Sequence, residues 1–164
     1  MALKAARFAN LFITGALTGN EFGSWAALHP ALRELPHQAH VRSEQAVTRR
    51  YGKMMPALMT GALVSFVPVL SLSTDRRRSL LIGLAGMVCY ATMLAITLTG
   101  NLPINRHTLE LNPDTTPREE FLELRARWDR LHTARNALNL AGFGLAILGV
   151  LSTDKPARQE DTMT

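Results

Sequence analysis

The chain has 164 residues, which is enough for about one domain. Its formal net charge is +5, but the Lys and Arg residues gather at the ends of apolar stretches, where they meet lipid headgroups, so the charge does not indicate a nucleic-acid partner. The single cysteine, Cys89, excludes an intrachain disulfide. The hydrophobic fraction of 47% averages long uncharged runs with charged connections, and the runs determine the class of protein.

Four stretches are apolar enough to be candidate membrane spans. A helix needs about 20 mostly apolar residues to cross a hydrocarbon core of about 30 Å. The candidates are residues 8–28, 54–72, 79–100 and 136–153. We therefore predict an all-α fold, a four-helix transmembrane bundle in the lipid bilayer, forming a single domain over residues 1–153. The polar residues 154–164 are predicted to be a disordered tail.

The first span combines a row of glycines with a buried acid. Gly15, Gly19 and Gly23 recur every four residues and let another helix approach closely, either within the bundle, in a homo-oligomer or in a membrane complex. Glu21 lies about two turns inside the span, where an ionisable group costs about 2.5 kcal/mol or more and marks a site with a partner. The sequence His29-Pro30 is expected to end this helix.

Residues 31–53 are amphipathic and mixed in charge. They predict an interfacial helix that lies on the membrane or folds over the mouth of the bundle. In the second span, Pro68 is expected to kink or end the helix. If the spans alternate, residues 29–53 and 101–135 share one side of the membrane. The positive flank of the first span, at Lys4 and Arg7, favours cytoplasmic termini in the cytoplasmic membrane, although more Lys and Arg residues lie on the other side.

The chain after the third span predicts a turn and then a long helix. Pro103 predicts a turn over 101–105, because proline disfavours a continued regular helix. Thr116 and Glu119 form a capping-box pattern, so the last helix is expected to run from Pro117 to about Ser152 and to project beyond the bilayer. One stripe of this helix is polar at helical spacing and is expected to face a site: Arg125, Trp128, His132, Arg135 and Asn139.

The residues that could carry chemistry fall on one side of the membrane. All five histidines lie in the segments 29–53 and 101–135, and Glu21 faces the same half of the bilayer. Three interpretations stay open. In the first, Glu21 and His132 form an acid–base pair, and Arg135 holds an anion or enolate. In the second, copper, iron or zinc is bound by His29, His132 and Glu21, with His37, His40 or His107 as further candidate ligands, although no HxxxH or HxxE spacing occurs. In the third, a buried polar network only fixes helix registry, and it consists of Glu21, Arg135, Asn101 and Asn105.

The turn Asn101-Leu-Pro103-Ile-Asn105, followed by Trp128, His132 and Arg135, resembles the pattern of the DUF1772 or anthrone oxygenase-like family of small integral membrane proteins. That pattern also has an acid in the first span and a His-Pro exit, which correspond to Glu21, His29 and Pro30. The resemblance implies an oxidoreductase that acts on a lipophilic aromatic or quinone-like substrate. The catalytic residues would be Glu21, His132 and Arg135, and the substrate-binding residues would be Asn101, Asn105, Trp128 and Trp25. The alternative is a non-catalytic membrane protein, either a subunit of a complex or a lipid- or ligand-binding module.

Overall fold

The computed structural model describes residues 1–73 and 77–152. All regular structure within these two ranges is helical, which confirms the predicted all-α class for them. The predicted tail at 154–164, and residues 75 and 76 of the charged connection before the third span, lie outside the described residues.

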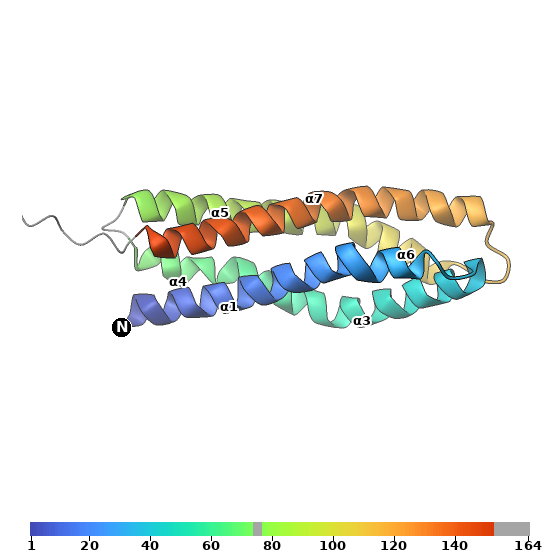
Figure 1. The fold of residues 1–164 in the computed structure, drawn as a ribbon, viewed down its shortest axis with the longest axis horizontal. Coiled ribbons are helices and arrows are strands. Elements are labelled where there is room, and N and C mark those ends of the chain that lie inside the picture. The colour runs from blue at the N-terminus through green and yellow to red at the C-terminus, as the bar shows by residue number, and fades with distance from the viewer. Residues whose placement is uncertain (74–76, 153–164) are drawn as a thin grey trace, which may run out of the picture.

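Several helical elements join end to end into long rods (Figure 1). The first rod is α1 (Ala2–Gly23), the π-helix η1 (Ser24–Leu28) and α2 (His29–Leu32). The second is α3 (His37–Val64) and α4 (Phe66–Ser71). The third is α5 (Arg77–Ile96), the π-helix η2 (Thr97–Asn101) and α6 (Leu102–Glu110), and the last is α7 (Arg118–Leu151). Helix α1 packs against α3 and α7, and α5 packs against the same two helices.

Three rods are long and apolar enough to cross a membrane, and they indicate an integral membrane protein. They are His37–Ser71, Arg77–Glu110 and Arg118–Leu151; the second contains the predicted span 79–100, and the other two cover all but the last residues of 54–72 and 136–153. The predicted span 8–28 is not among them, although its side chains Phe8 and Phe12 are as exposed as the apolar residues of the other spans. At 1.5 Å per residue, a rod of 34 residues measures roughly 50 Å, so each rod extends well beyond a hydrocarbon core of about 30 Å.

The two Pro-containing motifs do not end their helices, so the predictions of a helix end at His29-Pro30 and of a turn over 101–105 are wrong. Each motif follows a π-helical turn. The backbone N–H of His29 bonds to the carbonyl of Ser24, and that of Leu102 bonds to the carbonyl of Thr97. Each proline then lies in the first turn of the next α-helical segment, where an N–H has no helical partner to lose.

The predicted interfacial segment is also not separate, because residues 37–53 form the first half of α3. Their buried face packs against α6 and meets side chains of α7 such as Phe121 and Arg125, so it does not need the membrane surface. Gln45 donates from Nε2 to the carbonyl oxygens of Thr108 and Leu111, at 3.0 and 2.8 Å, and so binds the end of α6. This half of α3 precedes the predicted span 54–72 and carries all the charged residues of the helix.

Two further predictions about helix ends can be compared with the structure. The expected interruption near Pro68 is confirmed, since α3 ends at Val64 and α4 begins at Phe66. The predicted capping box is wrong: α7 begins at Arg118 with Pro117 as N-cap and no side-chain cap. Thr116 instead accepts a hydrogen bond on its backbone oxygen from His37 Nε2, at 2.9 Å.

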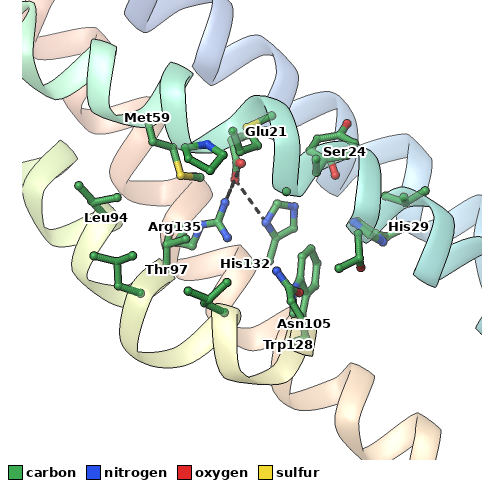
Figure 2. A pocket seen from close by; sticks show the side chains of 18 of the residues that line it. Glu21, Ser24, His29, Met59, Leu94, Thr97, Asn105, Trp128, His132 and Arg135 are labelled. Atoms are coloured by element: carbon green, nitrogen blue, oxygen red, sulfur yellow. Dashed lines mark hydrogen bonds and ion pairs between the residues drawn. The ribbon is translucent and has the colours of Figure 1, made fainter. Parts of the chain in front are cut away.

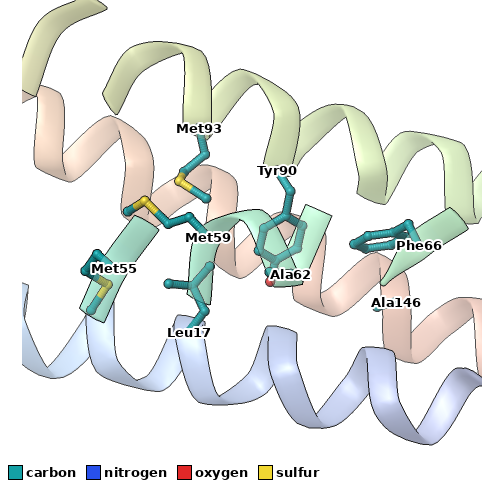
Figure 3. Close-up of a cluster of buried hydrophobic side chains, with 8 residues drawn as sticks. All are labelled: Leu17, Met55, Met59, Ala62, Phe66, Tyr90, Met93 and Ala146. Carbon is teal, nitrogen blue, oxygen red and sulfur yellow. The ribbon is translucent and has the colours of Figure 1, made fainter. Parts of the chain in front are cut away.

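The apolar core is divided by a polar layer. The larger cluster includes Tyr90, Phe66 and Met93 and lies within the predicted spans (Figure 3). A smaller cluster of Val41, Leu111 and Phe121 closes the far end, near the α6–α7 connection. The chemistry-bearing residues lie between these clusters along α1, α3 and α7.

Candidate functional site

The polar stripe of α7 faces the interior of the protein. Arg125, Trp128, His132, Arg135 and Asn139 are all buried, and none is more than 7% exposed. Burying two arginines, a histidine and a tryptophan on one face is favourable only where other elements supply polar partners. Those partners come from α1, α2, α3 and α6, whereas the buried side-chain amide of Asn139 has no hydrogen-bond partner among the described residues.

The first centre joins α1 to α7. Arg135 donates from Nη2 to both oxygens of Glu21, at 2.6 Å to Oε1 and 2.5 Å to Oε2 (Figure 2). His132 Nδ1 lies 3.4 Å from Glu21 Oε2. The three residues predicted to be catalytic are therefore brought together. Arg135 was expected to hold a ligand anion, and here it holds Glu21, while its buried Nε has no hydrogen-bond partner among the described residues.

A second centre, built around Glu44 of α3, was missed from the sequence. Its Oε1 lies 3.0 Å from His29 Nδ1, 3.3 Å from Arg125 Nη2 and 3.5 Å from His40 Nε2. Burial alone raises the pKa of the Glu44 carboxyl, but the imidazoles of His29 and His40 and the charge of Arg125 outweigh it and lower that pKa from 4.5 to about 2. The sequence did contain an indication of this centre: Glu44 follows His40 by four residues, which places both side chains on the same apolar face of an amphipathic helix.

Trp128 lies between the two centres. Its ring centroid is 4.5 Å from that of His29 and 4.4 Å from that of His132, and the guanidinium of Arg125 lies 4.3 Å from it as a cation–π contact. Its indole nitrogen donates to Asn105 Oδ1 at 2.8 Å. The indole therefore fixes the distance between the centres.

The other predicted substrate-binding residues differ in position. Asn105 and Trp128 line the main cavity. Asn101 is fully buried and donates from Nδ2 to the backbone oxygen of Trp128 at 3.4 Å, so it holds η2 against α7. Trp25 is 42% exposed, donates to Thr133 Oγ1 at 3.0 Å, and lines a second cavity rather than the first.

The main cavity has a volume of about 270 Å³ and one polar end. The polar end is formed by both centres and their neighbours: Glu21, Ser24, His29, Glu44, Asn105, Trp128, His132 and Arg135. The remaining wall is mainly apolar and comes from α3 and from α5 to α6, with Met55, Met59, Leu94, Leu98 and Leu102 among its residues. Figure 2 shows Glu21, Arg135 and His132 together, with Met59 and Leu94 beside them.

The residues predicted as metal ligands are divided between the two centres. His132 faces Glu21, whereas the Nδ1 of His29 faces Glu44 and lies 3.2 Å from Arg125 Nη2. Within residues 1–73 and 77–152, no group of three or more His, Cys, Asp and Glu side chains is arranged to hold a metal ion.

A family model described as anthrone oxygenase matches residues 45–145, which is more than half of the chain. The chain belongs to the anthrone oxygenase family. The predicted resemblance is thereby confirmed. The matched segment contains Asn101, Asn105 and the three α7 residues Trp128, His132 and Arg135, whereas Glu21, His29 and Glu44 precede it. No curated protein and no solved structure matches the chain.

Proposed function

We propose that this anthrone oxygenase family member is a four-span membrane oxidoreductase, with α1 as the fourth span and cytoplasmic termini, acting on a lipophilic aromatic or quinone-like substrate. The observation that carries the proposal is the buried Glu21–Arg135–His132 centre at the polar end of a largely apolar cavity. Apolar cavities with a few convergent polar groups are typical of small-molecule sites.

The cavity opening supports a substrate that arrives from the membrane. Gly52, Pro56 and Thr60 of α3 line the cavity and are also exposed on the surface, one turn apart. Opposite them, Leu98 lines the cavity and is 55% exposed. Most of these positions belong to the spans 54–72 and 79–100, so the opening faces the hydrocarbon core, and a hydrophobic ring system would enter without crossing water.

Charge balance favours a substrate that is neutral until it reacts. Glu21 and Arg135 already form a closed pair, and an additional buried charge would be costly. An anthrone is neutral and carries an acidic CH₂ group between two aromatic rings. Proton transfer from this carbon to Glu21, through the adjacent His132 or directly, would leave Arg135 free to pair with the enolate oxygen, so the net charge of the site would not change.

The complete reaction balances with dioxygen as the oxidant. The CH₂ carbon loses two hydrogens, one oxygen atom becomes its carbonyl oxygen, and the other leaves as water with both hydrogens. The substrate loses four electrons and dioxygen gains them. The protein residues supply the base, the counter-ion for the enolate and an apolar enclosure that excludes bulk water.

The alternative is a non-catalytic membrane protein that binds a ligand or joins a complex. One observation favours it: a Cβ added at Gly19 or Gly23 would meet nothing within 4 Å, so these two glycines face open space, where another helix could pack. Gly15 differs, since a Cβ there would lie 3.2 Å from Phe143 of the same chain.

Oxygen uptake by the purified protein tests the proposal. The protein in detergent is mixed with 1,8-dihydroxyanthrone, and uptake is compared with the spontaneous rate and with Arg135→Gln. We expect uptake above the spontaneous rate for the wild type and loss of that excess in the variant. If the wild type only matches the spontaneous rate, the oxygenase proposal is wrong, and binding of the anthrone without turnover would favour the alternative.

A further inference from the structure

A second cavity of about 320 Å³ adjoins the main cavity at His29 and His132. These two histidines line both cavities. The rest of the second cavity comes from the end of the first rod and from α7: Trp25, Ala26, Pro30, Arg33, Asp129 and Thr133. The histidines therefore form a shared wall between two spaces.

The second cavity is more polar than the main cavity, and it contains a charged pair. Arg33 donates to Asp129 at 2.7 Å across it, and the side chains of this pair are 50% and 25% exposed. Exposed charged groups are costly in hydrocarbon and are found where water reaches them. Trp25 lies beside the pair with its indole N–H bonded to Thr133, an arrangement typical of a tryptophan at the membrane surface. Asp129 and Thr133 also precede the apolar span 136–153.

The shared wall connects the two centres. The rings of His29 and His132 meet edge to face with centroids 5.6 Å apart. On one side His132 Nδ1 faces Glu21, and on the other His29 Nδ1 faces Glu44. An imidazole can accept a proton on one nitrogen and release one from the other, so this pair is suited to passing protons between the main cavity and water.

We propose that the second cavity is the aqueous entrance of the site, through which water and protons reach His29 and His132. The main cavity is correspondingly the lipid-side entrance. The statement about the substrate side rests on the proposed function, whereas the aqueous entrance does not. A proton taken from a lipophilic substrate would then leave through His132 and His29 without crossing hydrocarbon.

Cysteine accessibility tests the entrance without any enzymatic assay. The only native cysteine is removed by Cys89→Ala, His29→Cys is introduced, and the protein is placed in lipid nanodiscs so that both faces are open to the solution. The probe is a charged methanethiosulfonate, which reacts with thiols that water reaches. Ala26→Phe narrows the second cavity, and Gly52→Phe narrows the main cavity and is the matched control.

We expect His29→Cys to be modified, Ala26→Phe to slow the modification by about tenfold or more, and Gly52→Phe to leave its rate nearly unchanged. Slowing by Gly52→Phe without slowing by Ala26→Phe would overturn the proposal, because water would then arrive through the main cavity.

Because His29→Cys removes an imidazole from Glu44, a second pair of reporters leaves both centres intact. These reporters are Thr133→Cys and Thr60→Cys, because Thr133 lines only the second cavity and Thr60 lines only the main cavity. We expect the charged reagent to modify Thr133→Cys and to spare Thr60→Cys. An unreactive Thr133→Cys, or equal rates at the two positions, would overturn the proposal whether or not the protein oxidises anthrones.

Discussion

Arg135 of α7 donates hydrogen bonds from a single nitrogen, Nη2, to both carboxylate oxygens of Glu21 of α1, which lies 114 positions away in the sequence. Both residues are at least 96% buried. The pair therefore joins α1 to α7 and also occupies the polar end of the main cavity. A structural role and a catalytic role would share the same two side chains, so experiments have to separate them.

Breaking this pair and replacing it should have different effects on stability. Glu21→Gln leaves a buried guanidinium without a counter-charge, and we expect it to lower the free energy of unfolding by about 3–5 kcal/mol. Replacing both residues by Met removes both charges and should recover most of that loss, because well-packed apolar residues often substitute for buried ion pairs. Chemical unfolding in detergent measures both variants. Oxygenase activity should be absent from both; a stable double variant that retains activity would exclude Glu21 and Arg135 from catalysis.

The second centre predicts a dependence of stability on pH. The folded-state pKa of Glu44 lies below 4.5, at about 2, so its stabilising effect is fully present above pH 4.5 and is lost as the pH falls towards 2. The shift corresponds to about 3 kcal/mol. Unfolding free energies of wild type and Glu44→Gln, measured at several pH values between about 6 and 3, should therefore converge as the pH falls. Glu34→Gln, on the exposed end of the first rod, is the control, and a constant gap for Glu44→Gln would contradict the account.

If His29 passes protons to water, its loss should slow turnover more than it weakens binding. We expect His29→Gln to lower kcat by about 10²-fold, with partial recovery on adding free imidazole, while the Kd for a non-reacting anthraquinone stays close to that of the wild type. His107→Gln is the matched control, because His107 is exposed and lines neither cavity. Equal kcat values for wild type and His29→Gln would exclude the relay.

Two glycines of α7 predict opposite responses to alanine. At Gly142 an added Cβ would lie 2.8 Å from Tyr90 Cε2, and the buried Tyr90 cannot move freely because its hydroxyl bonds to Thr18 Oγ1 at 2.9 Å. We expect Gly142→Ala to destabilise the protein by about 1–3 kcal/mol. At Gly144 a Cβ would meet nothing within 4 Å, and Gly144→Ala should be neutral or stabilising by about 0.5–1 kcal/mol, since glycine weakens helices. Thermal unfolding distinguishes the two; equal Tm values would contradict the described packing.

Hydropathy and helical spacing were sufficient for the helical class, for the polar stripe of α7 and for its meeting with Glu21. These features follow from composition and period, which are local properties of the sequence. The errors came where tertiary partners override local rules. Pro30 and Pro103 stay helical because a π-helical turn precedes each. Residues 37–53 continue α3 because Leu111 and Phe121, at the α6–α7 end of the protein, pack against their buried face.

The missed Glu44 centre has the same cause. In the sequence, Glu44 looks like an ordinary charge on an amphipathic segment. Only the fold brings His29 of α2 and Arg125 of α7 to its carboxylate. Likewise, Trp25 shares a face of the first span with Glu21 in the sequence, but in the structure its indole bonds to Thr133 of α7 and lines the second cavity.

Isotope labelling of the product shows whether Glu21 and Arg135 promote the transfer of an oxygen atom from dioxygen to the substrate. The purified protein is incubated with 1,8-dihydroxyanthrone under ¹⁸O₂, and the anthraquinone formed above the spontaneous rate is analysed by mass spectrometry. The account predicts one labelled oxygen atom in the new carbonyl for the wild type and no product above the spontaneous rate for the Glu21→Met, Arg135→Met double variant. Unlabelled product, or the same yield from the double variant, would contradict it.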